Sequence, residues 1–190
     1  MSHPLIKYLE TLTTLSSSDR TLLISSFSPR TVKEGEVLSP AGKICHTLFF
    51  ICSGVLKIVM TNDKGIDVTY FFLKEEQFCT ILHSFNNEVP AAESIIAACD
   101  AEVLAITKTA LLELYQQLPW LKGLIDEITQ QRLIDKVLLR NSYQGEDSVS
   151  RYRLFLQQQG DIALRVPVKD IASYLGITPQ SLSRIRKNNR

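Results

Sequence analysis

The residues best suited to recognise another molecule lie close together near the C-terminal end of the sequence. Between positions 178 and 188, side chains that donate hydrogen bonds alternate with apolar ones; the donors are Gln180, Ser181, Ser183, Arg184, Arg186 and Lys187. Such side chains donate to the edges of bases and to phosphate groups. The segment therefore predicts contact with nucleic acid, and the alternative is an ordinary solvated basic face.

These donors need a rigid support, and the surrounding sequence predicts a helix-turn-helix. We expect a first helix over 168–175, with Gly176 in the turn because glycine adopts a positive φ at no steric cost. A second helix should follow Thr178, a hydroxyl N-cap, with Pro179 in its first position. The positions that must be small or apolar between the two helices are Ile171, Ala172, Leu175, Ile177, Leu182 and Ile185. A plain helical hairpin is the alternative.

Charge is distributed unevenly along the chain. The 190 residues include 21 Lys and Arg and 20 Asp and Glu, for a net charge of +1. Residues 148–190 hold eight basic and two acidic residues, which give +6. The remaining 13 basic and 18 acidic residues give −5 before position 148. This asymmetry indicates that only the C-terminal part meets a polyanion.

Other functional classes find little support in the sequence. No stretch approaches the roughly 20 apolar residues of a membrane span, and the N-terminus lacks the pattern of a secretory signal. We therefore expect a cytoplasmic protein with no membrane partner.

Cysteines and histidines are too scattered for a metal site. The four cysteines do not follow zinc or iron–sulfur spacing, and we expect buried free thiols rather than a redox sensor: Cys45, Cys52, Cys79 and Cys99. The three histidines are not paired at the ligand spacing that a cupin-like metal enzyme needs: His3, His46 and His83. We expect no metal, no cofactor and no enzymatic activity.

The N-terminal part of the chain predicts helices followed by a sheet. Apolar residues within 5–27 favour two short helices, and the run Ser16 to Asp19 suits a cap for the second. Between about 31 and 106, short β-rich runs alternate with turn residues, with strands expected at 47–52, 55–61, 67–73, 94–99 and 102–107. Many short strands at this spacing predict a small antiparallel barrel or roll.

Helical periodicity returns after position 109. We expect a helix over 110–117 capped by Thr109, and a long one from about 120 to 141 after Pro119. The long helix carries two successive apolar groups: Leu121, Leu124, Ile125 and Ile128, then Leu133, Ile134, Val137 and Leu138. About twenty helical residues span roughly 30 Å, more than one small roll covers, so this stripe predicts packing against a second copy. Packing against the chain's own roll is the alternative. A polar hinge, a helix over 149–159 capped by Ser148, and a strand within 162–166 should follow.

This order of elements resembles the Crp/Fnr family of bacterial transcription regulators. The resemblance rests on residues 35–38 (GEVL), 51–57 (ICSGVLK) and 171–178 (IASYLGIT). It implies an α+β fold with four parts. These are a jelly-roll-like, cyclic-nucleotide-binding-type β-roll with flanking helices (1–117), a long dimerisation helix (118–142), a hinge (143–147) and a helix-turn-helix DNA-binding domain (148–190). It also implies a homodimer on promoter DNA, with RNA polymerase as a further partner.

The resemblance also assigns contacts with DNA. Base edges would be read by Gln180, Ser181 and Arg184, with Thr178 at the start of the same helix. Arg184 is the strongest candidate because arginine paired with guanine is the commonest specific contact. Lys169 and Lys187 would serve phosphates. Family members add a β-hairpin wing after this helix, whereas only residues 188–190 follow here, so we expect no wing and fewer phosphate contacts.

The expected effector pocket departs from the family pattern. Relatives that bind cyclic nucleotides use a Glu for the ribose and an Arg for the phosphate, but Ile81 and Ala91 or Ala92 stand at those places, followed by Glu93. Two like charges about 4 Å apart cost ~1 kcal/mol in water and several in protein, so a phosphate there is disfavoured. An unidentified effector, or none, is expected instead of cyclic AMP or cyclic GMP. The candidate pocket residues are Thr80, Ile81, Leu82, His83, Ala91, Ala92, Glu93 and Ser94.

Two functions follow from these observations. The first is a dimeric, sequence-specific DNA-binding transcription regulator with a divergent sensor roll. The second is a ligand-binding module that signals through protein contacts and keeps a vestigial helix-turn-helix.

Overall fold

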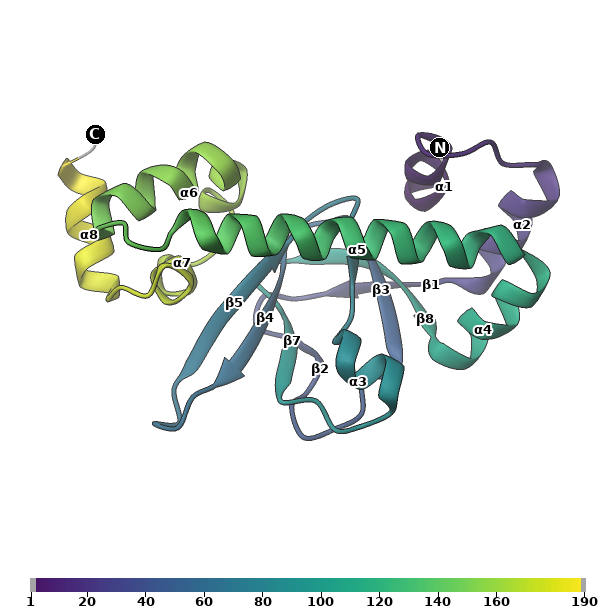
Figure 1. Ribbon diagram of the computed structural model, residues 1–190, viewed down its shortest axis with the longest axis horizontal. Coiled ribbons are helices and arrows are strands. Elements are labelled where there is room, and N and C mark those ends of the chain that lie inside the picture. The colour runs from purple at the N-terminus through teal and green to yellow at the C-terminus, as the bar shows by residue number, and fades with distance from the viewer. Residues whose placement is uncertain (1–2, 189–190) are drawn as a thin grey trace.

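The structure is a computed structural model and describes residues 3–188. A β-roll lies at its centre, one long helix crosses the roll, and shorter helices gather at both ends of that helix (Figure 1). Helices α1, α2 and α4 lie at one end, and α6, α7 and α8 at the other. Within the described residues, no helix is both long and apolar enough to cross a bilayer.

The two short N-terminal helices are present as predicted. Helix α1 spans Pro4–Glu10 and α2 spans Ser17–Ser26. Ser16 caps α2 reciprocally: the amide of Asp19 donates to its hydroxyl, and its own amide donates to the Asp19 carboxylate, both at 3.1 Å. Leu5, Leu9 and Leu23 are fully buried against the roll and the helices beside it, so both helices close one end of the main core.

The roll consists of two four-stranded antiparallel sheets, which confirms the predicted fold class. The strands are β1 (Ser28–Val32), β2 (Val37–Ser39), β3 (Thr47–Ser53), β4 (Leu56–Thr61), β5 (Asp67–Leu73), β6 (Phe78–Cys79), β7 (Glu93–Ala97) and β8 (Ala101–Thr107). The sheet orders are β1-β8-β3-β6 and β2-β7-β4-β5. Between β3 and β4, Gly54 has φ +91°, and a Cβ there would lie 2.5 Å from the Asp100 carbonyl oxygen. This crowding explains the glycine in the 51–57 motif.

Two short helices accompany the roll. Helix α3 (Leu82–Asn87) follows β6, and α4 (Lys108–Gln117) follows β8. The predicted cap at Thr109 is wrong: the Thr107 hydroxyl accepts from the amide of Ala110 at 3.2 Å. The helix starts earlier because β8 runs directly into it at Thr107.

The long helix α5 (Pro119–Ser142) presents two different apolar faces. Leu121, Ile125 and Ile128 are buried in the chain's own core, between 1% and 9% exposed, and Leu124 packs beside the same core. The prediction that these four residues form the dimer face is wrong, because the chain's own core already takes up their side chains. The steps from Ile128 to Leu133 and Ile134 do not keep a helical period of 3.6, so the second apolar group is turned away from the first, with Leu133 at its edge beside the roll. That group is 46–62% exposed and consists of Leu133, Ile134, Val137 and Leu138.

Helix α6 (Ser148–Ala163) begins after a turn over 143–147. Its cap is Asp147 rather than the predicted Ser148, since the Asp147 carboxylate accepts from the Ser150 amide at 2.8 Å. The predicted helix end at 159 is confirmed, because Gln159 leaves the helical conformation (φ −139°, ψ 32°) and the chain kinks there. The predicted strand within 162–166 is wrong, because a further helical stretch follows the kink and reaches Ala163. Ile162 and Ala163 are then buried in a third core, which favours helix over an unpaired strand.

That third core joins the C-terminal helices to the roll. Val55, Phe72 and Ala98 come from the roll, and they pack with Phe155 and other residues of α6, α7 (Val168–Leu175) and α8 (Pro179–Asn188). We call these residues the junction core. Because one apolar cluster includes both parts, the C-terminal helices are packed onto the roll of the same chain.

Candidate DNA-binding site

Helix α7 has the bounds that the sequence predicts, and α8 begins where it is predicted to begin. Gly176 ends α7 in the left-handed conformation, with φ +67°. Thr178 caps α8, because the Ser181 amide donates to its hydroxyl at 3.1 Å. Arg151 of α6 donates to the Leu175 carbonyl at 2.6 Å and satisfies an otherwise open end of α7. The angle between the two helices is therefore fixed by the backbone, by caps and by a neighbouring helix.

Apolar residues hold the two helices together from within. Ala172 is completely buried and leaves room for α8 to approach. Ile171, Leu175, Leu182 and Ile185 are at most 9% exposed and share the junction core with α6. Burial of Leu182 and Ile185 turns the opposite side of α8 outward.

The outward face of α8 carries the predicted donors. Gln180, Arg184 and Lys187 are all exposed, and their spacing of four and three residues aligns them on one side. Within residues 3–188, none of the three side chains has a hydrogen bond or ion pair inside the chain. A helix face with unengaged donors has the chemistry needed for a groove of DNA.

Thr178 and Ser181 are in a different situation. The Thr178 hydroxyl donates to the Ser181 hydroxyl at 3.0 Å while accepting from the Ser181 amide. Both side chains therefore contribute to the cap of α8, and Ser181 is only half-buried beside it. Their main role in the free protein is to start the helix.

Lys169 lies apart from the α8 donors. It is exposed, and it lines a hollow of about 240 Å³ with Lys57, Asp67 and other roll residues, to which no described residue of α8 contributes. The structure therefore brings Gln180, Arg184 and Lys187 together but leaves Lys169 on the roll side of α7.

Helix α7 is clamped to the roll by buried polar contacts that the sequence did not predict. The Lys57 ammonium lies 2.6 Å from the Asp170 carboxylate, with side chains only 13% and 10% exposed. Nearby, the Ser173 hydroxyl accepts from the Thr69 amide at 3.0 Å. These partners are more than 100 residues apart in the chain, and no local pattern signals such pairing.

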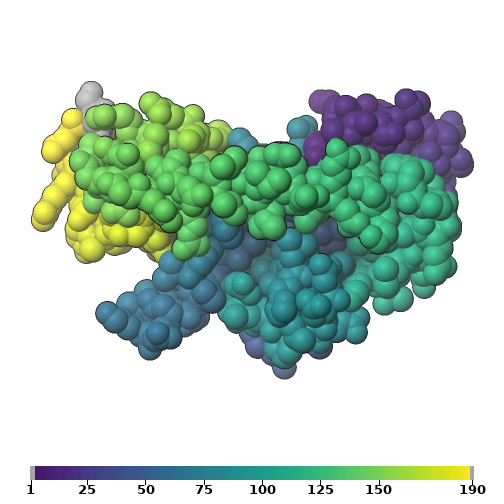
Figure 2. Space-filling model, in the orientation of Figure 1, coloured from purple at the N-terminus to yellow at the C-terminus, as the bar shows by residue number. Residues whose placement is uncertain are grey.

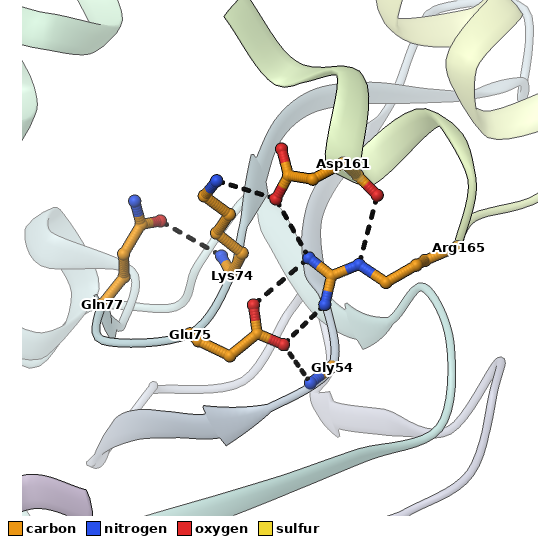
Figure 3. A network of polar contacts seen from close by, with 6 residues as sticks. All are labelled: Gly54, Lys74, Glu75, Gln77, Asp161 and Arg165. Atoms are coloured by element: carbon orange, nitrogen blue, oxygen red, sulfur yellow. Dashed lines mark hydrogen bonds and ion pairs between the residues drawn. The ribbon is translucent and has the colours of Figure 1, made fainter.

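A second polar network joins α6 to the turn after β5 (Figure 3). Arg165 donates to both carboxylate oxygens of Glu75 at 2.6 and 3.2 Å, and Asp161 lies between Arg165 and Lys74. Glu75 also accepts from the Gly54 amide at 2.7 Å. Burial alone would raise the pKa of Glu75, but hydrogen bonds from Arg165 and Gly54 outweigh it and hold that pKa below its usual value. The network locks the end of α6 onto both sheets.

The predicted effector residues do not form one polar pocket. Ile81 and Ala91 are buried within the apolar interior of the roll, whereas Leu82, His83 and Ala92 are exposed. The Thr80 hydroxyl donates to the Thr47 carbonyl at 2.9 Å, and the Ser94 hydroxyl accepts from the Ala41 amide at 2.9 Å. Glu93 is half-buried. Only Thr80 and Leu82 line the larger hollow beneath α5.

All four cysteines are free thiols, as predicted, and none is fully exposed. Cys45 and Cys79 are buried, and Cys52 and Cys99 are half-buried. Burial raises the pKa of Cys79 to about 12 and also raises the pKa values of Cys52 and Cys99. Thiols with raised pKa values hold little of the reactive thiolate. Residues 3–188 contain no group of three or more His, Cys, Asp or Glu side chains arranged to hold a metal ion.

Comparison with known proteins begins with the roll. Residues 29–118 match the family model of the cyclic nucleotide-binding domain. No curated protein sequence matches the chain. The roll is therefore similar to domains of this family.

Solved structures of similar fold extend over nearly the whole chain. The c-di-GMP-responsive global regulator CLP of Xanthomonas campestris is 15% identical, with a TM-score of 0.73 over 91% of each chain. FixK2 of Bradyrhizobium japonicum is 14% identical, with a TM-score of 0.72 over 85% of this chain and 83% of that one. A protein described as a transcriptional regulator of the crp/fnr family from Eubacterium rectale is 18% identical, with a TM-score of 0.72 over 96% and 87%. At identities this low the likeness concerns the fold alone, which this chain shares with these three regulators.

Proposed function

We propose that this chain is a sequence-specific DNA-binding transcription regulator of Crp/Fnr type, with α7 and α8 as its helix-turn-helix. The observation that carries the proposal is the outward face of α8, where Gln180, Arg184 and Lys187 are exposed and unengaged. The charge of +6 over 148–190 favours a polyanionic partner for the same segment. The similar fold of known regulators supports this assignment.

The proposed active form is a homodimer through the outer face of α5. Leu133, Ile134, Val137 and Leu138 form an apolar stripe that is 46–62% exposed, and α5 stands as a ridge across this face of the molecule (Figure 2). Two copies paired along this stripe would present two α8 helices to one duplex. Such dimers read half-sites about one helical turn, ~34 Å, apart.

Regulation would involve partners beyond DNA. A small-molecule effector in the roll and contact with RNA polymerase both fit a regulator of this fold. The effector would not be cyclic AMP bound in the usual way, because Ile81 and Ala91 or Ala92 supply no charged side chain for it. Burial of Ile81 and Ala91 in an apolar interior supports a different effector chemistry.

Selection of bound sequences from a random DNA pool tests the proposal. We expect enrichment of a site with two-fold symmetry, and binding that weakens steeply as salt rises because phosphate contacts release counterions. Recovery of no preferred sequence, together with no salt-dependent affinity, would contradict the proposal and favour a signalling module that acts through protein contacts.

A further inference from the structure

The roll-facing side of α5 changes chemistry halfway along the helix. At about 100° per residue, Leu121, Ile125, Ile128, Arg132 and Lys136 follow one face. The first three are buried apolar residues, and the next two are cations. A helix that only covers a sheet keeps its inner face apolar, so the two cations require an explanation.

Lys136 is a half-buried cation that lacks an acidic partner. Its ammonium lies 4.8 Å from the centre of the Phe71 ring, and within residues 3–188 it forms no ion pair or hydrogen bond. Burial lowers its pKa, and the charge of Arg132 adds to this effect. Arg132 itself only approaches Asp135, at 3.9 Å. An anion placed between these two side chains would compensate a desolvated charge and gain charge-assisted hydrogen bonds.

Hollows along α5 lead to this pair of cations. One, of about 500 Å³, lies between α3, α4 and α5 and is lined by apolar side chains such as Leu82, Phe85, Leu111 and Leu112. A small one of about 50 Å³ shares Leu82 and Leu133 with it and adds Arg132 and Lys136. A third, of about 280 Å³, continues beyond Arg132 and Lys136. Taken together, these hollows form a groove that is lined by apolar side chains at one end and by two cations at the other.

The other cations near the apolar hollow are already neutralised. Lys108 pairs with Glu88 at 3.1 Å, and Lys122 pairs with Asp126 at 2.6 Å. This leaves Arg132 and Lys136 as the place for a ligand's charge. A cavity of about 500 Å³ is within the usual size range for small-molecule sites.

We propose that this groove binds a fatty-acid-like amphiphile, with its carboxylate between Arg132 and Lys136 and its apolar chain in the hollow lined by Leu82, Phe85 and Leu112. Its role as an effector rests on the proposed regulator function, because Leu133 belongs both to the groove and to the proposed dimer face. Binding itself does not depend on that function and is measured without DNA.

The test is a calorimetric titration of the full chain with dodecanoate, below its micelle concentration, alongside dodecanol and acetate. We expect dodecanoate to bind more tightly than either. Lys136→Gln should weaken the binding of dodecanoate at least tenfold and leave the affinity for dodecanol unchanged. Arg132→Gln, whose side chain is 44% exposed, should act in the same direction and guards against misfolding of the first variant. Leu112→Gln should weaken the binding of both long-chain ligands. Lys64→Gln, on the β4–β5 turn, is the matched control and should bind them like wild type.

Two results would overturn the proposal. One is the absence of binding by dodecanoate. The other is equal binding of dodecanoate and dodecanol by the wild-type chain and the Lys136→Gln variant. Neither result depends on whether the protein binds DNA, so failure of this site is distinguishable from failure of the regulator function.

Discussion

Arg165 and Glu75 form a two-pronged ion pair, at 2.6 and 3.2 Å, that ties the turn after α6 to the roll. Glu75 at the same time accepts from the amide of Gly54, a position where no other residue fits. A single carboxylate thus connects the tight turn of the roll with the helices that carry the proposed DNA-binding face.

Removal of the Glu75 charge should loosen this connection. Glu75→Gln keeps the size of the side chain, so the expected loss of about 1 kcal/mol reflects the half-exposed ion pair. For a chain of this size the midpoint of thermal unfolding should fall by roughly 2–4 °C. Hydrogen exchange should also accelerate in α6 and α7. Arg30→Gln, which removes the exposed Arg30–Glu36 pair elsewhere on the roll, is the control, and an equal effect of both variants would contradict this role.

The same pair should make stability depend on pH in the acid range. The folded-state pKa of Glu75 is lowered, so its stabilising effect is complete above the unfolded value of about 4.3 and is lost as pH falls through the folded value. The difference in unfolding midpoint between wild type and Glu75→Gln should therefore be constant from pH 7 to 5 and shrink below about pH 4. Thermal unfolding across this range measures it, and a gap that stays constant down to the pH at which the chain unfolds in acid would refute the assignment.

Two leucines in the C-terminal part test whether burial determines how much each side chain contributes to stability. Leu182 is completely buried between α7 and α8, whereas Leu164 is 86% exposed after α6. Leu182→Ala should lose about 2–5 kcal/mol of stability because it leaves a cavity, and Leu164→Ala should lose almost none. Chemical denaturation of both variants gives the comparison. Similar losses would show that α8 is not anchored as described.

The outer face of α5 should govern association. Val137→Asp combined with Leu138→Asp places charges on the exposed stripe and leaves the buried face of the helix intact. Analytical ultracentrifugation should show a dimer for wild type and a single chain for this double variant. Ile66→Asp, at an exposed apolar residue of the β4–β5 turn, should leave the dimer unchanged. Sedimentation of the wild-type chain as a monomer would contradict the proposed dimer.

Much of the fold could be predicted from local sequence signals. The bounds of α7, the start of α8 and all of β5 follow from caps, a turn glycine and β-rich composition over a few residues. Errors arose where a nearby alternative had similar local chemistry: Thr107 caps α4 in place of Thr109, and Asp147 caps α6 in place of Ser148. The stretch after Gln159 was predicted as strand because Gly160 suggested a helix end, whereas burial of Ile162 in the junction core keeps it helical.

The site was less predictable because it depends on contacts between distant segments. The apolar pattern of α5 did not reveal which of its residues the roll buries: Ile128 is 9% exposed, whereas Leu133 is 52% exposed. The pairs Lys57–Asp170 and Glu75–Arg165 join residues 113 and 90 positions apart, and no spacing rule identifies them. The expected missing wing falls at 189–190, outside the described residues, and stays a prediction.

The most direct test of the account measures DNA binding by the face of α8. Fluorescence anisotropy with the selected DNA site should show that Arg184→Ala loses about 1–3 kcal/mol of binding free energy and discriminates less at one base pair. Arg20→Ala, on α2 at the other end of the molecule, should bind like wild type. Unchanged affinity and unchanged sequence preference in Arg184→Ala would contradict the central claim that this exposed face reads DNA.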